Sequence, residues 1–314
     1  MKMRKLGNTG MMVSEIGLGA WQLANPDWKL DNQEDALRIV KSSLDAGCNF
    51  FDTAPGYGGG RSEELLGKGL KGRRQDVVIC SKFSHVMAEG VRREFVPSDI
   101  RTVLEGSFRR LGTDYLDVLL LHNPPRELMD GVRAPGLYRE LEALKKEGKI
   151  RAYGVSLDWG VELERVARTT ASTACEVMYN ALYLEPEEAF PEAAERGIGL
   201  IVKVPLDSGW LSGRYDRQTR FDDIRKRWSP EIIERRFALV EKLKEFLEPG
   251  ENLARLALQF CLARNEVSTV IPGAKTVEQA LENFAAADHE LPAETVSKIR
   301  ELWTNEIVGS PLPW

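Results

Sequence analysis

Eight short apolar runs alternate with amphipathic stretches along nearly the whole chain of 314 residues, and this alternation limits the possible folds most strongly. Most of the runs are rich in Val, Ile, Leu or aromatic residues and are bounded by Gly, Pro or Asn, as buried parallel strands are. They span residues 15–18, 49–52, 77–81, 117–122, 151–156, 176–180, 199–204 and 268–271. Between them, stretches such as 34–46 and 98–111 repeat apolar residues at helical spacing. Eight strand–helix units are the number found in a closed (β/α)₈ barrel.

A doubly wound open sheet is the competing architecture for such an alternation. It usually carries a G-x-G-x-x-G turn after its first strand, followed by an acidic residue at the end of the second. Here Gly17-Leu18-Gly19 supplies only two of those glycines, and no acidic residue stands at the expected distance. No disordered linker or shorter repeat interrupts the chain. We therefore predict one α/β domain over residues 1–314, folded as a single (β/α)₈ TIM barrel.

Composition excludes several classes of partner. The net charge of −5 and the pI of about 5.6 disfavour nucleic acids and anionic membranes. No run approaches the length of a transmembrane span, and the N-terminus lacks the apolar region of a signal peptide. The four cysteines are scattered among apolar residues without metal-binding spacing, which favours a reducing compartment. We expect a cytoplasmic protein with no nucleic-acid, membrane or metal partner.

Ionisable residues end three of the predicted strands. Asp52 ends the run 49–52, Lys82 follows the run 77–81, and His122 ends the run 117–122. Tyr57 lies in a glycine-bounded turn just after Asp52. Each of these residues alone has an ordinary structural explanation, such as a helix cap, a loop anchor or packing. Because active sites of (β/α)₈ barrels lie at the carboxyl ends of the strands, we expect the four side chains to converge there.

The four residues together suit proton transfer to a carbonyl group. Buried charges are costly unless paired, so Asp52 and Lys82 are expected to form an ion pair. The Lys82 ammonium beside Tyr57 is expected to lower the pKa of the phenol from its ordinary value of about 10. His122 can then orient the carbonyl oxygen while Tyr57 donates a proton. No side chain supplies a hydride, so a nicotinamide cofactor is implied.

The strand-end residues belong to a series of motifs that follow one another along the chain. They are Gly17-Leu18-Gly19-Ala20-Trp21, Phe51-Asp52-Thr53-Ala54, Tyr57-Gly58, Ser81-Lys82-Phe83, Leu121-His122-Asn123, Gly148-Lys149-Ile150-Arg151, Gly154-Val155-Ser156, Pro205-Leu206 with Gly209, Leu211-Ser212-Gly213, and Ile271-Pro272-Gly273-Ala274-Lys275 with Glu282-Asn283. In this order the sequence resembles the aldo-keto reductase family from Leu6 to about Ala287. The resemblance implies a (β/α)₈ barrel, with a short N-terminal β-hairpin capping the barrel bottom. It also implies that Asp52, Tyr57, Lys82 and His122 are the catalytic residues.

The resemblance further implies an extended NADP(H), with NAD also possible, bound without a Rossmann domain. Residues 206–213 resemble the loop that folds over the pyrophosphate, and Lys275 lies where a 2′-phosphate is held. The residues implied to contact the cofactor are Gly19, Ala20, Trp21, Asp52, Ser156, Glu176, Lys203, Pro205, Leu206, Gly209, Leu211, Gly213, Gly273, Ala274, Lys275, Gln279, Glu282 and Asn283.

Three positions depart from the family pattern at the nicotinamide end. Leu157 follows Ser156 where members of the family often have Asn. Glu176 replaces a frequent glutamine, and Lys203 replaces an aromatic residue that commonly stacks on the nicotinamide. These changes leave open how the nicotinamide is held and whether NADPH or NADH is preferred.

Two alternatives to a reductase remain open. Lys203 inside a barrel strand could form a Schiff base, as in class I aldolases, but this would leave Asp52, Tyr57, Lys82 and His122 unexplained. The chain could instead be a cofactor-binding regulatory subunit with little turnover. The complete set of four residues favours a working enzyme.

Aromatic residues in the loops suggest a pocket for a small aldehyde, ketone or sugar carbonyl, without choosing among them. We expect Trp21, Tyr57, Phe83 and His122 to contact the substrate. Further candidates for the pocket wall are Trp28, His85, Trp159 and Trp314. The oligomeric state is left open.

Overall fold

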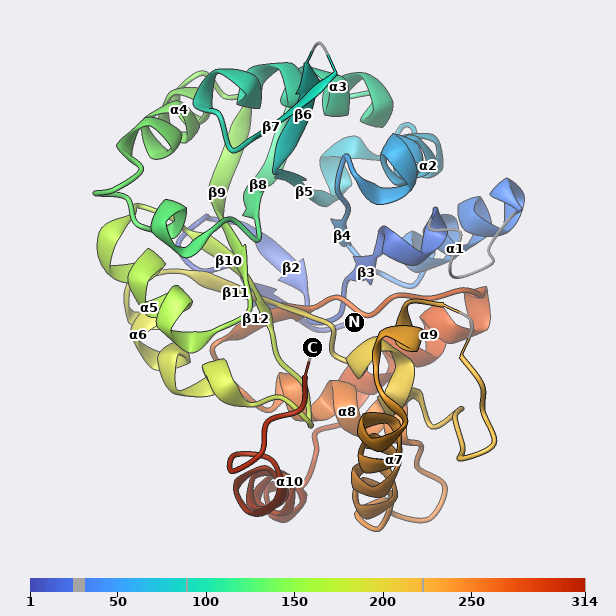
Figure 1. The fold of residues 1–314 in the computed structure, drawn as a ribbon. Helices are drawn as coiled ribbons and strands as arrows, with labels where there is room; N and C mark the ends of the chain where they lie inside the picture. The colour runs from blue at the N-terminus through green and yellow to red at the C-terminus, as the bar shows by residue number, and fades with distance from the viewer. Residues whose placement is uncertain (25–31, 89, 222, 314) are drawn as a thin grey trace.

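Eight parallel strands form the centre of the molecule in a computed structural model that describes residues 1–24, 32–88, 90–221 and 223–313 (Figure 1). In sheet order they are β12 (Val267–Val270), β11 (Gly199–Lys203), β10 (Ala174–Met178), β9 (Ile150–Leu157), β8 (Leu116–His122), β5 (Val78–Phe83), β4 (Phe50–Asp52) and β3 (Leu18–Gly19). Parallel bridges from Ile16 to Val270 and from Gly19 to Gly273 join the first strand to the last. The sheet therefore closes, and the predicted (β/α)₈ barrel is confirmed.

Helices surround the strands (Figure 1). They are α1 (Gln33–Asp45), α2 (Arg61–Gly69), α3 (Ile100–Leu111), α4 (Pro135–Lys146), α5 (Gly160–Thr169), α6 (Phe190–Glu195), α7 (Pro230–Lys244), α8 (Leu253–Leu262), α9 (Val277–Ala285) and α10 (Ala293–Glu306). Each buries one apolar stripe, as α1 buries Ala36, Ile39 and Val40. Asn32 begins α1 by accepting a hydrogen bond from the backbone N–H of Glu34. None of the helices in the described part of the chain is long and apolar enough to cross a membrane.

The N-terminal hairpin closes the bottom of the barrel, as expected. Its strands, β1 (Met3–Lys5) and β2 (Met12–Ser14), are antiparallel. Hairpin residues Leu6, Met11 and Val13 belong to the apolar cluster that fills the barrel. The strand residues of that cluster are Phe50, Val78, Cys80, Val118, Leu120, Ala152, Ala174 and Ile201, with Ile271 after β12. Because apolar side chains fill the barrel from below, the polar strand ends are left at the opposite mouth.

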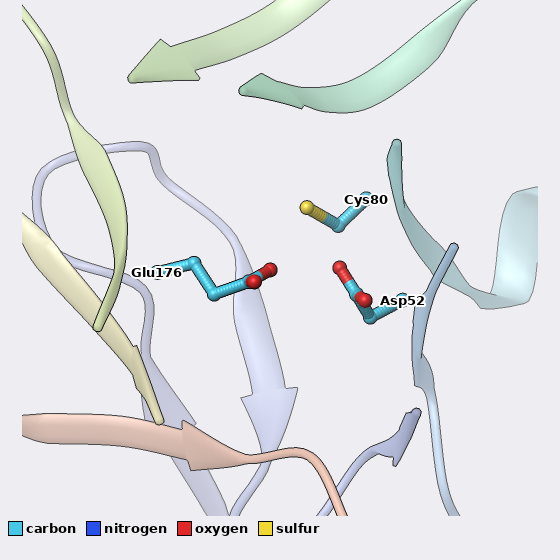
Figure 2. A group of neighbouring side chains, drawn as sticks. All are labelled: Asp52, Cys80 and Glu176. Carbon is cyan, nitrogen blue, oxygen red and sulfur yellow. The ribbon is translucent and has the colours of Figure 1, made fainter. Parts of the chain in front are cut away.

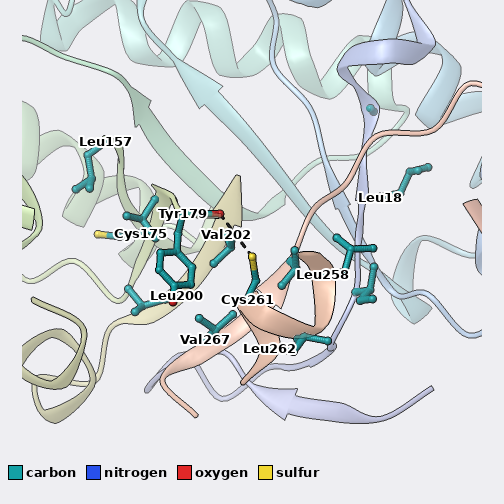
Figure 3. Packing of buried hydrophobic residues seen from close by; sticks show 14 of the residues in the cluster. Leu18, Leu157, Cys175, Tyr179, Leu200, Val202, Leu258, Cys261, Leu262 and Val267 are labelled. Atoms are coloured by element: carbon teal, nitrogen blue, oxygen red, sulfur yellow. Dashed lines mark hydrogen bonds between the residues drawn. The ribbon is translucent and has the colours of Figure 1, made fainter. Parts of the chain in front are cut away.

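A larger apolar core lies between the sheet and the helices. Figure 3 shows part of it, where residues of β10, β11 and β12 pack against α8. There the Cys261 thiol lies 3.6 Å from the Tyr179 carbonyl oxygen, to which it donates a hydrogen bond. All four cysteines are buried and unpaired, in keeping with their apolar surroundings in the sequence.

Three local features differ from the sequence prediction. The sixth strand is β10 (Ala174–Met178) rather than 176–180, because Asn180 leaves the sheet and pairs with Tyr183. The first strand is reduced to β3 because residues 15–17 contact β12 only through isolated backbone bonds. A second hairpin of β6 (His85–Ala88) and β7 (Val91–Glu94) is inserted between β5 and α3.

Candidate active site

The four residues predicted to be catalytic lie together at the mouth of the barrel. Asp52 is the last residue of β4, Lys82 is the fifth of β5, and His122 is the last of β8. Tyr57 begins the 3₁₀ helix η3 (Tyr57–Gly60), which follows β4. Gly58 and Gly59 of this turn have positive φ angles, a conformation that L side chains rarely adopt. The turn thereby brings Tyr57 back over the strand ends.

Lys82 and Asp52 form the predicted ion pair. The Lys82 ammonium donates hydrogen bonds to Asp52 Oδ1 at 2.7 Å and Oδ2 at 2.5 Å, and to the carbonyl oxygen of Thr53 at 3.0 Å. Both charged side chains are almost fully buried. The pair is therefore held in one geometry by three hydrogen bonds in a place that water hardly reaches.

A second carboxyl group reaches the same ammonium from across the barrel. Glu176 Oε2 lies 3.1 Å from Lys82 Nζ, and Glu176 itself is buried. Figure 2 shows Asp52 and Glu176 pointing toward each other inside the strands. Glu176 was predicted only as a cofactor contact, so its place beside Lys82 was missed. The signal for it was the acidic residue in an otherwise apolar strand.

Tyr57 stays protonated at neutral pH in this setting. Its ring centroid lies 5.4 Å from Lys82 Nζ and 5.9 Å from the His122 ring. Burial raises the pKa of the Tyr57 hydroxyl above its ordinary value, and the ammonium of Lys82 opposes this only in part. The expected net lowering of this pKa is wrong, because loss of solvation of the phenolate outweighs the attraction to Lys82. The Tyr57 hydroxyl thus keeps its proton rather than being partly ionised.

His122 is neutral at physiological pH. Burial lowers its pKa to about 3, and repulsion from the Lys82 ammonium acts in the same direction. A neutral imidazole can still donate one hydrogen bond. It can therefore orient an oxygen atom beside Tyr57 without adding a positive charge.

Asp52, Cys80 and Glu176 form a group whose ligand atoms lie within 4.8 Å of one another (Figure 2). Two features make this group unsuited to a metal ion. The Lys82 ammonium already contacts both carboxyl groups. Burial raises the pKa of the Cys80 thiol well above its ordinary value, so the thiolate that a metal requires is disfavoured.

Lys203 at the end of β11 is held in a polar network. Its ammonium donates hydrogen bonds to Asn123 Oδ1 at 2.8 Å and to Ser156 Oγ at 2.9 Å, and it lies 2.9 Å from Asp158 Oδ1. Schiff-base formation requires an amine that is free to attack a carbonyl carbon, whereas the amine of Lys203 is engaged by three polar partners. The Ser156 hydroxyl in turn lies 3.0 Å from Glu176 Oε1. Lys203 is therefore bound in place beside the carboxyl groups.

A cavity of about 850 Å³ extends outward from this group of residues. Its inner end is lined by Trp21, Tyr57, His122, Glu176 and Lys203, with Asp52 beneath. Its outer end lies between the loops after β11 and β12. Predicted cofactor residues that line the cavity are Gly19, Trp21, Asp52, Glu176, Lys203, Pro205, Leu206, Gly209, Gly273, Lys275, Gln279, Glu282 and Asn283.

Several predicted residues do not line the cavity. Phe83 is buried and packs edge-on against Phe95, with ring centroids 6.0 Å apart, so the substrate contact predicted for it is wrong. Side chains alternate along a strand, and Phe83 therefore faces away from the side to which Lys82 points. The predicted residues outside the lining are Ala20, Lys82, Phe83, Ser156, Leu211, Gly213 and Ala274. Of these, Ala20, Leu211 and Ala274 are buried and support the turns behind the cavity wall.

The further pocket candidates have other places. Trp159 is exposed and packs against Tyr183, and His85 lies in β6; neither lines the cavity. Trp28 and Trp314 lie outside the described residues.

The loop after β11 forms one wall of the outer end and holds an unusual backbone. Val204, Asp207 and Ser208 all have φ angles near +50°, which non-glycine residues adopt rarely. A buried ion pair between Asp207 and Arg236 of α7 anchors the loop. Arg236 also donates a hydrogen bond to the carbonyl oxygen of Pro313, 2.7 Å away, so the chain end is tied to the same point.

The loop after β12 forms the other wall and leads into α9. Thr276 caps α9 by accepting a hydrogen bond from Gln279 N. Gln279 Oε1 accepts one from Lys275 N at 3.0 Å, and Asn283 Nδ2 donates one to the Gly273 carbonyl at 3.3 Å. Gln279 and Asn283 thus hold the turn at residues 273–275, which presents Lys275 and a helix N-terminus to the cavity.

The outer end fits a phosphate-bearing dinucleotide. Besides Lys275, two arginines from the loop after β11 line it, Arg214 and Arg227. Cationic side chains beside a helix N-terminus favour phosphate groups. Lining residues that were not expected from the sequence are Gln22, Val204, Arg214, Tyr215, Arg227, Asn252, Ala254, Ile271 and Pro272, whereas Ser208 and Ser212 fall within the predicted loop 206–213. Most of them lie in loops whose path has no periodic sequence signal.

Comparison with known proteins agrees with this geometry. The model of the Aldo/keto reductase family matches residues 15–304. The chain is 31% identical to the L-galactose dehydrogenase of Arabidopsis thaliana, over 96% of this chain and 94% of that one. It is 30% identical to the aldo-keto reductase yakc [NADP(+)] of Schizosaccharomyces pombe, over 99% and 94%. The chain belongs to the aldo/keto reductase family.

A solved structure supports the same assignment. The holo form of the aldo-keto reductase AKR11C1 from Bacillus halodurans is similar to this chain with a TM-score of 0.81. The two are 31% identical, and the match covers 96% of each chain. The barrel and the cavity at its mouth are therefore those of a family of oxidoreductases that act on carbonyl groups.

Proposed function

We propose that this protein is an NADPH-dependent reductase that converts an aldehyde, ketone or sugar carbonyl to the alcohol, with NADH as a possible second cofactor. The observation that carries the proposal is the placement of Tyr57 and His122 beside the Lys82–Asp52 ion pair, at the inner end of a cavity whose outer end is basic. A nicotinamide dinucleotide held along the cavity would supply the hydride for the carbonyl carbon.

The chain's own residues supply the proton and the orientation. Tyr57 donates its hydroxyl proton to the carbonyl oxygen, as expected for a general acid. Lys82 then stabilises the tyrosinate electrostatically, and Asp52 holds the ammonium in place. His122 donates a hydrogen bond to the same oxygen as charge develops on it. Reduction by NADPH also consumes one proton, which Tyr57 regains from solvent through the cavity.

The cofactor is proposed to lie along the cavity with its phosphates at the outer end. Lys275 supports a preference for NADPH, as does the relative in Schizosaccharomyces pombe whose name carries NADP(+). Ser156, Glu176 and Lys203 are proposed at the nicotinamide end. Of the substrate contacts expected from the sequence, Trp21, Tyr57 and His122 are retained, and all three line the cavity.

The protein is proposed to act as a single domain over residues 1–314 in the cytoplasm. Four buried, unpaired cysteines support a reducing compartment. The acidic net charge disfavours a nucleic-acid partner. The similarity to an L-galactose dehydrogenase supports sugar carbonyls among the substrates to be tried.

Turnover with NADPH and a carbonyl compound tests the proposal. The purified protein is mixed with NADPH and 4-nitrobenzaldehyde, then with a panel of sugars, while cofactor absorbance is followed. Loss of NADPH that depends on the carbonyl compound supports the proposal. Tight NADPH binding without turnover would instead indicate a regulatory subunit. Consumption of a carbonyl compound without NADPH, abolished by Lys203→Met, would indicate an aldolase.

A further inference from the structure

The inner end of the cavity holds two buried carboxyl groups against one ammonium. We propose that Asp52 and Glu176 share a single proton, and that Glu176 is therefore a positioning residue that sets the charge beneath Tyr57 and His122. The shared proton is a property of the free protein; only its kinetic consequence rests on the proposed function.

The hydrogen bonds of Lys82 leave one carboxyl oxygen without a donor. An ammonium has three N–H groups, and those of Lys82 go to both oxygens of Asp52 and to the carbonyl of Thr53. Glu176 Oε2 is buried and accepts no hydrogen bond from the residues that the structure describes, although it lies 3.1 Å from Lys82 Nζ. A buried carboxylate oxygen without a donor costs free energy.

The donor that fits this oxygen is the other carboxyl group. A carboxyl oxygen of Asp52 and one of Glu176 lie within 4.8 Å of each other, and a hydrogen bond between the two side chains contributes to the pKa of both groups. Two carboxylates have only acceptor atoms, so a hydrogen bond between them requires that one be protonated. One of the two carboxyl groups must therefore carry a proton, because all three N–H groups of Lys82 already have other acceptors.

The charges around the pair lead to the same conclusion. The titratable and charged groups that face it are Lys82 and Cys80 of β5, Tyr57 of η3, His122 of β8 and Lys203 of β11. Cys80, Tyr57 and His122 are neutral at physiological pH for the reasons given above, and Lys203 is paired with Asp158. Two ionised carboxylates against Lys82 would leave one negative charge in a buried place, and one shared proton removes it.

The pKa values of the two groups are pushed apart. Burial, followed by repulsion from Glu176, raises the pKa of Asp52 to about 8. Burial also acts to raise the pKa of Glu176, but attraction to Lys82 and then to Lys203 lowers it to about 2. One of the two carboxyl groups therefore holds a proton at neutral pH, and the two titrations belong to the pair as a whole rather than to either residue.

The shared proton has a consequence for the proposed reaction. Both Asp52 and Glu176, when ionised, raise the pKa of Tyr57 and so weaken it as a proton donor. While the pair holds its proton, the group formed with Lys82 is neutral and Tyr57 is the stronger acid. Once the proton is lost at alkaline pH, carbonyl reduction should slow. The substitution Glu176→Gln should remove this dependence of the reduction rate on pH, because the glutamine amide can donate a hydrogen bond to an ionised Asp52.

Carbon-13 NMR of the free protein tests the proposal directly. The side-chain carboxyl carbons of Asp and Glu are labelled in separate samples and titrated from pH 4 to pH 10. We expect one carboxyl resonance of the wild type to titrate near pH 8. In Glu176→Gln that titration should move to lower pH, because the repulsion from Glu176 is removed while the burial of Asp52 and its contact with Lys82 remain. The absence of any carboxyl group titrating above pH 6 in the wild type would overturn the proposal, as would an unchanged titration in Glu176→Gln.

Two further variants guard against a merely structural effect. Glu176→Asp keeps a carboxyl group and should retain a high titration, and it serves in place of Glu176→Gln if that variant does not fold. Glu142→Gln removes a carboxyl group of α4, remote from the cavity, that accepts a hydrogen bond from Tyr153; it should leave the high titration unchanged. Because these spectra need no turnover, they remain decisive even if the NADPH assay shows no activity.

Discussion

The inner and outer ends of the cavity are built in different ways. Strand ends of β4, β5, β8 and β10 supply the inner end, where buried charges contact one another directly. Loops after β11 and β12 supply the outer end, where the backbone has several positive φ angles and the cationic side chains are partly or fully exposed. Under the proposed function, the inner end would carry out the chemistry and the outer end would bind the phosphates of the cofactor. A substitution at one end can therefore show whether the other end depends on it.

The largest effect is expected from Tyr57→Phe at the inner end. Removing the proton donor should lower kcat for carbonyl reduction by about 10²–10⁴-fold. The affinity for NADPH, measured by quenching of tryptophan fluorescence, should stay nearly unchanged. Turnover close to that of the wild type would contradict the role of Tyr57.

Next comes the ion pair that anchors the outer end. Arg236→Met leaves Asp207 buried without its partner and should cost about 3–5 kcal/mol of unfolding free energy. The loop at residues 204–213 should also lose its geometry, so NADPH should bind less tightly. Urea unfolding and NADPH titration measure the two effects. The double variant Asp207→Asn, Arg236→Met serves as the control and should recover part of the stability; no recovery would show that the ion pair is not the cause.

Because His122 is buried in its neutral form, the free energy of unfolding should decrease at acid pH. Its pKa is about 3 in the folded protein and about 6.5 in an unfolded chain. The unfolded state therefore takes up the proton first, so this contribution is complete above pH 6.5 and is lost as the pH falls from 6.5 toward 3. The urea-unfolding free energy of the wild type, relative to that of His122→Asn, should fall by a few kcal/mol over that window. A constant difference between the two proteins would contradict the buried neutral imidazole.

The smallest effect concerns the recognition of phosphate at the outer end. Lys275→Ala should weaken NADPH binding by about tenfold, equivalent to 1.4 kcal/mol, and should leave NADH binding nearly unchanged. Parallel titrations with NADPH and with NADH measure the change in affinity for each cofactor. If affinity for both falls equally, Lys275 does not read the 2′-phosphate.

The two ends also differ in how far the sequence predicts them. Asp52, Lys82 and His122 end or follow apolar runs, so strand periodicity alone places them at one mouth. The ion pair of Lys82 with Asp52 followed from the cost of burying charge. The pKa of Tyr57 was predicted in the wrong direction, because the extent of its burial depends on the tertiary structure.

At the outer end the sequence carried less information. Arg214, Arg227 and Asn252 line the cavity through loop conformations and helix placements that no local pattern encodes. Phe83 was expected in the pocket because it follows Lys82 in the same motif. Side chains alternate along a strand, however, so Phe83 points into the apolar core instead.

Transfer of deuterium tests the central claim most directly. The protein is supplied with NADPH carrying deuterium at the transferable nicotinamide position and with 4-nitrobenzaldehyde, and the alcohol is analysed by mass spectrometry. We expect the wild type to form an alcohol with one deuterium on the former carbonyl carbon, and Tyr57→Phe to form much less of it despite normal NADPH binding. An alcohol without deuterium, or equal transfer by both proteins, would contradict this expectation.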